Sequence, residues 1–283
     1  MKTFKFPSVY RETPIYIPGS FYFNNRHYLI AENALQKPRL ASWLYSTSDL
    51  VSAYPLFLSY LSSSFSSSIT TVTLPLADTL RKDLVSPLEE QGLTVIPQGL
   101  AALYHHELDI SPDKNLILLI DGGFRTVNIA LVERSTKNVL FLKTHYDEIG
   151  IRNLLEGEFQ PRLETVLPDM TDNPVQLNKA FLEGKIDDGF KTLSLIEEKN
   201  LALQSFTSRF LALLETDLRR NSLSFDLALL VGGIGHYLVP ENFGSMPVMI
   251  PQNSEWSNAL GASEITGSSA LDLGFGHGKL VIV

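Results

Sequence analysis

The sequence predicts an α/β protein built from two similar lobes. Its length of 283 residues exceeds the usual size of a single hydrophobic core. Strand-like apolar runs alternate with helix-like segments along the chain. Two glycine-rich turns far apart in the sequence also share one plan, in which an apolar strand and an aspartate come before the turn and a second apolar strand follows it. We therefore expect one copy of this β-hairpin in each lobe, with a cleft between the lobes.

The composition is that of a soluble, cytoplasmic protein. Hydrophobic residues make up 44% and charged residues 19% of the chain, which argues against disorder. The absence of cysteine excludes disulfides and thiolate metal sites and is compatible with a reducing cytosol. No apolar run approaches the roughly 18 residues that a membrane span requires, and residues 1–14 lack the apolar core of a signal peptide. The net charge of −8 gives no general basic surface for direct binding of nucleic acid.

The first part of the chain is expected to mix short strands with helices. A turn is predicted at Asn24 and Asn25, between two strands. Apolar residues at helical spacing predict a helix over 41–61, and the serine-rich stretch 61–68 is predicted to be a surface connection. Further strands are expected at 2–8, 21–31, 69–76 and 93–97, and further helices at 77–91 and 99–108.

The remainder of the chain is expected to start with an antiparallel meander and to end with a hairpin. The unbroken apolar run at 115–123 predicts a buried strand. Residues 150–220 are predicted to be mostly helical, and the last of these helices has one buried face, made of Leu203, Phe206, Phe210, Leu213, Leu214 and Leu218. Other expected elements are strands at 126–133, 138–146 and 225–233, a helix at 257–265, a Gly-Ser-Ser link at 267–269 and a final hairpin within 270–283.

Three glycine-rich turns carry the functional signal, at 120–132, 229–238 and 271–283. A single glycine after a strand is usually only a conformational requirement of the turn. Three such turns together are typical of a site that holds phosphate, because backbone N–H groups in the bend can donate to phosphate oxygens and glycine allows close approach. Lys279 can place a positive charge on the outer phosphates. Asp121 and Asp272 can hold Mg²⁺ through its water ligands.

These motifs resemble those of the ATPase superfamily of actin, heat-shock chaperones and sugar kinases. The pattern D-x-G-x-x-x-x-K fits Asp272, Gly274 and Lys279. The pattern D-x-G-x-x-T-x-[DN] fits a second set, which is Asp121, Gly123, Thr126 and Asn128. The adenosine-binding turn of the family fits Val231, Gly232, Gly233 and Gly235. Within the superfamily the chain looks most like the ParM and archaeal-actin type, on the evidence of Phe6-Pro7-Ser8, Leu74-Pro75-Leu76 and the segment 95–104.

The resemblance implies a fold of two duplicated ribonuclease H-like domains and a set of site residues. Lobe I would comprise 1–119 with 264–283, and lobe II would comprise 120–263. ATP or ADP would bind with Mg²⁺, and the expected nucleotide-binding residues are Asp272, Gly274, Phe275, Gly276, His277, Gly278, Lys279, Gly122, Gly123, Phe124, Arg125, Thr126, Gly232, Gly233, Ile234 and Gly235. Arg125 could contact phosphate or could only cap its turn. Asp121 is also expected to take part in catalysis.

The order of the motifs differs from the order in the family. Family members begin with the hairpin that here comes last, in 270–283. Joining Val283 to Lys2 restores the family order through a tight turn, and the Gly-Ser-Ser segment would then link the ancestral ends. The sequence is therefore predicted to be circularly permuted, by a natural or an engineered rearrangement, with its opening in a hairpin turn where permutation is well tolerated.

Gln98 is expected to orient the water that attacks the γ-phosphate, because actin-like relatives carry Gln or Glu at this place. The alternative is a solvent-exposed residue at the start of a helix. A sugar kinase needs a carboxylate to deprotonate the acceptor hydroxyl, which an amide cannot replace.

The resemblance implies an ATP hydrolase that polymerises head to tail and moves plasmid DNA through a DNA-bound adaptor protein, without direct contact with nucleic acid or membrane. Two alternatives stay open: a non-polymerising ATP-binding scaffold of the PilM kind, and a small-molecule kinase.

Overall fold

The computed structural model describes residues 1–37, 40–167, 174–187 and 191–283. The chain divides into two compact units, Met1–Ser111 with Trp256–Val283 and Pro112–Glu255. These units differ from the expected lobes by eight residues at each boundary. The difference at the second boundary arises because helix α7 (Ser257–Thr266) packs along α3 (Leu100–His106), which belongs to the first unit.

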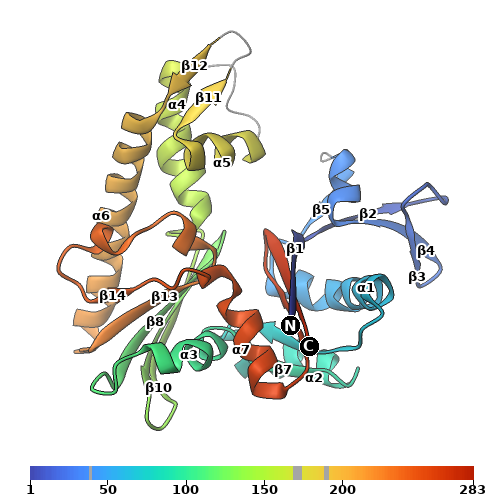
Figure 1. The fold of residues 1–283 in the computed structure, drawn as a ribbon, viewed down its shortest axis with the longest axis horizontal. Helices are drawn as coiled ribbons and strands as arrows, with labels where there is room; N and C mark the ends of the chain where they lie inside the picture. The colour runs from blue at the N-terminus through green and yellow to red at the C-terminus, as the bar shows by residue number, and fades with distance from the viewer. Residues whose placement is uncertain (38–39, 168–173, 188–190) are drawn as a thin grey trace. The chain divides into compact units, whose positions relative to one another are not determined.

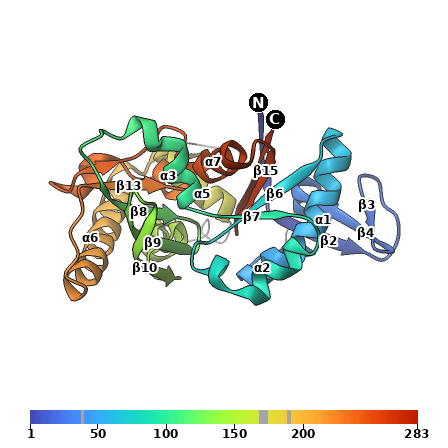
Figure 2. The ribbon, with the colours of Figure 1, turned by 90° about the horizontal axis from the view of Figure 1, so that it is seen from below.

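The first unit is built on a five-stranded sheet with the order β1-β16-β15-β6-β7. Its strands are β1 (Lys2–Pro7), β6 (Ile69–Leu74), β7 (Thr94–Pro97), β15 (Ser269–Leu273) and β16 (His277–Ile282). Helices α1 (Thr47–Phe65) and α2 (Lys82–Glu89) share a hydrophobic core with one face of the sheet. Small residues of α3 and α7 pack against Ala270 on β15. Figure 2 shows α3 and α7 next to each other.

A smaller sheet is inserted in the first unit between β1 and α1. Its order is β3-β4-β2-β5, with β2 (Val9–Thr13), β3 (Phe21–Phe23), β4 (Arg26–Ile30) and β5 (Ser42–Trp43). The turn between β3 and β4 is at Asn24 and Asn25, as predicted, and both residues have positive φ. A 3₁₀ segment, η1 (Ala31–Gln36), follows β4.

The second unit repeats the strand arrangement of the first in a sheet with the order β10-β9-β8-β13-β14. Its strands are β8 (Leu116–Gly122), β9 (Thr126–Glu133), β10 (Asn138–Tyr146), β13 (Leu227–Val231) and β14 (Val248–Met249). In both sheets three antiparallel strands are followed by two parallel ones. This repetition confirms the expected duplication of the hairpin.

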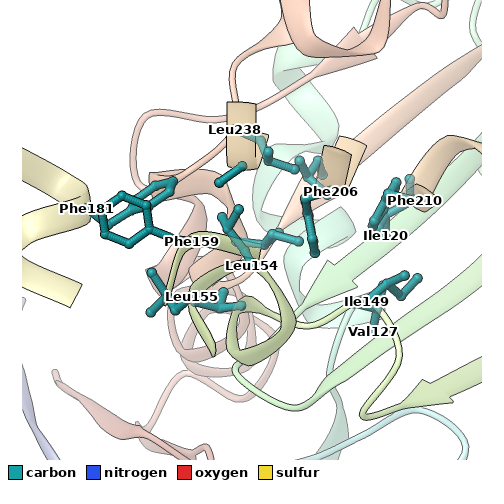
Figure 3. Close-up of a cluster of buried hydrophobic side chains, with 14 of the residues drawn as sticks. Ile120, Val127, Ile149, Leu154, Leu155, Phe159, Phe181, Phe206, Phe210 and Leu238 are labelled. Atoms are coloured by element: carbon teal, nitrogen blue, oxygen red, sulfur yellow. The ribbon is translucent and has the colours of Figure 1, made fainter. Parts of the chain in front are cut away.

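One face of the second sheet is covered by helical segments that form a large hydrophobic core (Figure 3). These segments are the π-helical turn η5 (Asn153–Phe159), α4 (Gln160–Val166), α5 (Pro174–Glu183) and α6 (Ile196–Arg220). Phe206, Phe210 and Leu214 of α6 are buried, which confirms the face predicted from the spacing. A short hairpin of β11 (Lys185–Asp187) and β12 (Thr192–Ser194) interrupts the region that was predicted to be mostly helical.

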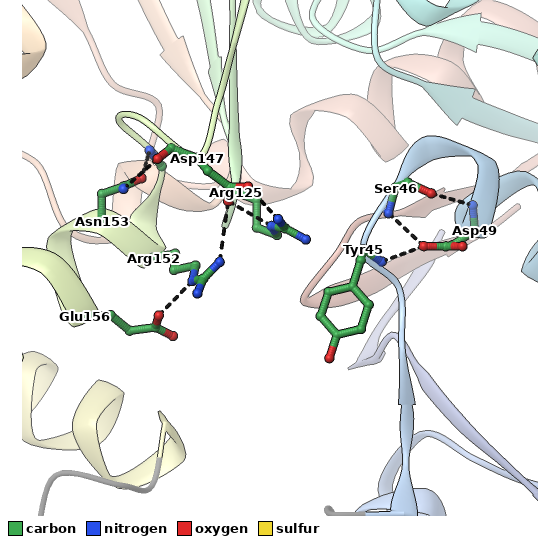
Figure 4. A network of polar contacts seen from close by, with 9 residues as sticks. Tyr45, Ser46, Asp49, Arg125, Asp147, Arg152, Asn153 and Glu156 are labelled. Atoms are coloured by element: carbon green, nitrogen blue, oxygen red, sulfur yellow. Dashed lines mark hydrogen bonds and ion pairs between the residues drawn. The ribbon is translucent and has the colours of Figure 1, made fainter.

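Two local predictions near α1 were wrong. The helix does not begin at residue 41 but at Thr47, where Ser46 and Asp49 form a reciprocal cap (Figure 4). The serine-rich stretch is not a surface connection throughout, because α1 continues to Phe65 and ends at Ser66 in the left-handed conformation. Phe65 packs against the core of the first unit, and this apolar contact retains the last turn in the helix.

The final hairpin pairs with the N-terminal strand, which agrees with the tight turn expected on joining Val283 to Lys2. Strand β16 lies between β15 and β1, with Ile282 opposite Lys2 and His277 opposite Pro7. The N- and C-terminal ends lie next to each other in both views (Figure 1, Figure 2). Among the described residues, no helix combines the length and the hydrophobicity that crossing a bilayer requires.

Candidate functional site

The C-terminal hairpin (β15–β16) and the central hairpin (β8–β9) have the same register. Asp272 is paired with Lys279 in the first, and Asp121 is paired with Asn128 in the second. Both aspartates are buried, with 3% and 7% of the residue exposed. Each hairpin therefore places a buried carboxylate on its first strand, shortly before the turn.

The turn of the C-terminal hairpin offers backbone donors. The amide of Gly274 donates to the carbonyl of His277 at 3.1 Å, which closes the turn. The amides of Phe275 and Gly276 have no acceptor among the described residues. The carbonyl of Gly276 accepts from the amide of Ser8 at 3.1 Å, which fixes this peptide group against the end of β1. Two adjacent N–H groups in a fixed turn fit the requirement for phosphate oxygens.

The turn of the central hairpin is closed in the same way, since the amide of Gly123 donates to the carbonyl of Thr126 at 2.8 Å. The segment after β10 holds the turn from one side, where the amide of Arg152 donates to the carbonyl of Phe124 at 2.8 Å. The amide of Phe124 itself has no acceptor within the described part of the chain. This turn therefore also presents a backbone N–H group that could donate a hydrogen bond to a phosphate oxygen.

Arg125 is engaged with a neighbouring acid. Its Nε lies 2.9 Å from Oδ1 of Asp147 and its Nη2 lies 2.5 Å from Oδ2, a bidentate ion pair (Figure 4). The hydrogen bond from Arg125 lowers the pKa of Asp147. Of the two roles considered for Arg125, this arrangement favours the one that stabilises the turn.

Asp272 is the centre of a polar cluster in the first unit. Its Oδ1 accepts hydrogen bonds from Thr73 Oγ1 at 2.6 Å and from Gln98 Nε2 at 2.7 Å. Its Oδ2 lies 3.7 Å from Nζ of Lys279, whose side chain is 13% exposed. The structure thus brings Gln98 next to Asp272 and Lys279, which belong to one motif, and it adds Thr73, which lies in none of the motifs.

Gln98 is held firmly at the start of α3. Its backbone amide donates to Leu74 at 2.8 Å, and the next amide, of Gly99, donates to Asn258 Oδ1 at 2.7 Å. The side-chain Nε2 is committed to Asp272 and to Thr73, at 3.2 Å from the latter. Oε1 has no donor within the described residues, so it is an oriented acceptor for a water proton. A residue simply exposed at a helix start would not be fixed in this way.

The third glycine-rich turn follows β13 and lies against Asp121. Gly232 has φ +81° and ψ −172°, and a Cβ at this position would lie 2.6 Å from Oδ1 of Asp121. Its amide donates to the carbonyl of Ser254 at 2.9 Å. The second unit therefore joins Asp121 to the predicted adenosine turn, with Ile234 packed over Gly122.

Gly278 has a packing role that its motif did not suggest. A Cβ at Gly278 would lie 2.3 Å from the ring of Phe6, because β1 pairs antiparallel with β16 and Phe6 is directly opposite Gly278. The absence of a side chain here is required by the protein itself. Phosphate binding by Gly278 and by exposed His277 remains a prediction.

The donor set fits Mg²⁺ held mainly through water. No cluster of three or more Asp, Glu, His or Cys side chains able to hold a metal occurs among the described residues. Asp272 accepts two hydrogen bonds through Oδ1, which leaves Oδ2, 3.7 Å from Nζ of Lys279, as the oxygen that could accept from a water ligand. Mg²⁺ usually keeps several waters and takes few carboxylates directly, so a site with few carboxylates suits it.

Comparison with solved structures places this fold. The archaeal actin homologue Ta0583 matches with a TM-score of 0.70 and 18% identity, over 93% of this chain and 92% of that one. The fold is that of actin-like proteins. A 15-stranded ParM filament from Clostridium botulinum matches with a TM-score of 0.68 and 19% identity over the same shares of the two chains. The actin-like protein Alp7A matches with a TM-score of 0.58 and 16% identity, over 88% of this chain and 83% of that one.

Whole-chain sequence comparison finds no relative, although the short motifs show the resemblance. No protein-family model matches the chain, and no curated protein matches it either. The actin-like fold is therefore supported by the structural comparison and by the repeated sheet topology. Because this chain is less than 20% identical in sequence to each of these three structures, the comparison supports a shared fold and not a shared activity.

Proposed function

We propose that this chain is an actin-like ATPase that binds ATP with Mg²⁺. The observation that carries the proposal is the repeated hairpin, in which a buried aspartate precedes a turn that offers backbone N–H groups without acceptors. The structure of Ta0583 in complex with ADP supports a nucleotide as the ligand of this fold. In the first unit Asp272 would hold Mg²⁺ through a water ligand, and Lys279 would bind the outer phosphates. In the second unit Asp121 and the turn at Gly232–Gly235 would hold the nucleotide.

The proposed hydrolysis depends on Gln98. Its Nε2 is held by Asp272 and Thr73, so its Oε1 would accept a hydrogen bond from the attacking water and fix the direction of attack. Lys279 would stabilise the charge that develops on the phosphate oxygens. Gln98 cannot remove a proton from a sugar hydroxyl, which favours hydrolysis over transfer to an acceptor.

Binding is tested by thermal unfolding with and without Mg-ATP. A ligand that binds only the folded state at 100 times its dissociation constant stabilises it by about 2.7 kcal/mol. Asp272→Ala, Asp121→Ala and Lys279→Ala should each reduce the gain in melting temperature. Lys2→Ala, at the exposed start of β1, is the matched control and should retain the full gain. An unchanged gain in all three site variants would contradict the proposal.

Polymerisation is the second part of the proposal. The filament formed by the ParM of Clostridium botulinum supports it, since a head-to-tail contact between unlike surfaces need not close into a ring. Light scattering and negative-stain microscopy should show filaments after addition of Mg-ATP. A monomer at high concentration with ATP bound would support the scaffold alternative, and ADP release that depends on an acceptor would support a kinase. Plasmid movement through an adaptor is the proposed use of such filaments, because the charge of −8 opposes direct contact with DNA.

We also infer that the strand order reflects a circular permutation. In the second unit the three antiparallel strands β8, β9 and β10 follow one another, whereas their equivalents in the first unit are β15, β16 and β1. A rearranged chain with Val283 joined to Lys2 by a short turn, and opened between Gly267 and Ser268, should fold with the same stability. It should also show the same response to nucleotide. Failure of this chain to fold would contradict the inference.

A further inference from the structure

Tyr54 of α1 lies beneath the polar cluster and is fully buried, with 0% of the residue exposed. Its hydroxyl donates to the carbonyl of Thr73 at 2.6 Å and accepts from the amide of Leu273 at 3.3 Å. Both partners are backbone groups on neighbouring strands of the first sheet. A single side-chain oxygen therefore connects β6 to β15.

The hydroxyl lies where direct pairing of these strands stops. Parallel pairing between β6 and β15 runs to Leu271 and Val72, and the described residues show none beyond this point. The amide of Leu273 and the carbonyl of Thr73 come next along the two strands, and both bind the tyrosine hydroxyl instead of each other. The hydroxyl thus holds the strand ends apart and still satisfies both groups.

The same strand ends carry the cluster around Asp272. Thr73 and Leu273 are the residues that Tyr54 binds, and Asp272 precedes Leu273 directly. Thr73 Oγ1 and Gln98 Nε2 both donate to Asp272 Oδ1. A change in the spacing of the strand ends would therefore change the direction of the Gln98 amide. Burial, with the nearby negative charge of Asp272, raises the pKa of Tyr54, so its hydroxyl remains a donor.

We propose that Tyr54 is a positioning residue for the hydrolytic reaction. Its hydroxyl sets the separation of the strand ends that carry Asp272 and Thr73, and thereby the direction in which Gln98 presents its oxygen to water. This inference rests on the proposed ATPase function. Tyr54 acts through these residues and contacts neither nucleotide nor water itself.

The first test is Tyr54→Phe, which keeps the ring in the core and removes only the bridging oxygen. Hydrolysis at saturating Mg-ATP should fall by about 10- to 100-fold, because small misplacements of reacting groups have effects of this size. The dissociation constant of Mg-ATP should change by less than about threefold, since orientation of the water matters in the transition state. Tyr60→Phe is the matched control on the same helix, where the hydroxyl has no partner among the described residues, and it should behave as wild type.

A double-mutant cycle separates positioning from a general loss of stability. If Tyr54 acts through Gln98, the variant with both Tyr54→Phe and Gln98→Ala should hydrolyse ATP at the rate of Gln98→Ala alone. If the rate of the double variant is reduced by the product of the two single reductions, the inference is overturned.

Two NMR measurements on the nucleotide-free protein test the inference without activity. The side-chain amide resonance of Gln98 should shift in Tyr54→Phe and remain in place in Tyr60→Phe. An unchanged resonance in Tyr54→Phe would overturn the inference, whereas a shift in a chain that binds no ATP would overturn only the proposed function. In the wild-type protein the hydroxyl proton of Tyr54 should give a resolved signal with a nuclear Overhauser effect to the amide of Leu273. Absence of that signal would overturn the inference even if Tyr54→Phe did not fold.

Discussion

Replacement of Gly232 by alanine tests the geometry of the turn after β13. The residue has φ +81° and ψ −172°, a region that is open essentially only to glycine. A Cβ would lie 2.6 Å from Oδ1 of Asp121 and 2.6 Å from the carbonyl oxygen of Gly122. The carbonyl belongs to β8 in the middle of the sheet, so it cannot move away without disturbing the strand pairing.

Two costs add up in Gly232→Ala. The strained backbone conformation costs about 1–3 kcal/mol, and the overpacking against β8 costs about 1–3 kcal/mol more. The free energy of unfolding should therefore fall by about 2–6 kcal/mol. Because Asp121 is displaced, the gain in melting temperature from Mg-ATP should also decrease.

The assay is urea unfolding followed by far-UV circular dichroism, which reports on the helices of both units and to which α6, of 25 residues, contributes from the second unit. Gly244→Ala is the control in the same unit, since Gly244 has φ +61° but no atom within 4 Å of its added Cβ. It should show only the cost of the backbone conformation. If Gly232→Ala and Gly244→Ala lose the same free energy of unfolding, the close approach to Asp121 and Gly122 is refuted.

Three further outcomes are expected. Gln98→Ala should slow phosphate release at least about tenfold while the dissociation constant of ATP stays nearly unchanged, and a wild-type rate would reduce Gln98 to a helix-start residue. Gly278→Ala should lower the stability of the first unit by about 1–3 kcal/mol through its contact with Phe6, as measured by fluorescence of the two tryptophans, both in that unit. Burial raises the pKa of Asp217, but hydrogen bonds from Lys143 and His145 outweigh it and lower this pKa overall. Asp217→Asn should therefore cost about 3 kcal/mol at pH 7, and urea unfolding at several pH values should show the difference shrinking below about pH 4.

The repeated hairpins could be predicted from the sequence because their chemistry is local. An aspartate, a short glycine turn and two flanking apolar strands lie within a dozen residues, so Asp121 and Asp272 were identified directly. The pairing of β16 with β1 followed from the family order of the same motifs. In contrast, the domain boundaries depend on which surface α7 packs against, which is a tertiary contact with no local signal.

The residues that were missed act across the fold. Thr73 and Tyr54 reach Asp272 and its neighbour from segments about 200 residues away in sequence, so no motif contains them together. One signal for Tyr54 was available, since a tyrosine within a buried helical stripe must find a partner for its hydroxyl. The packing role of Gly278 depends on Phe6, at the other end of the chain, and only the assembled sheet reveals it.

The most direct test of the account is a crystal structure with Mg²⁺ and a non-hydrolysable ATP analogue. Phosphate oxygens should lie within hydrogen-bonding distance of the amides of Phe275, Gly276 and Phe124, with Nζ of Lys279 on the outer phosphates. Mg²⁺ should contact Asp272 through water. A nucleotide bound elsewhere, with these amides bonded to water or protein, would contradict the central claim that the repeated hairpins form the phosphate site.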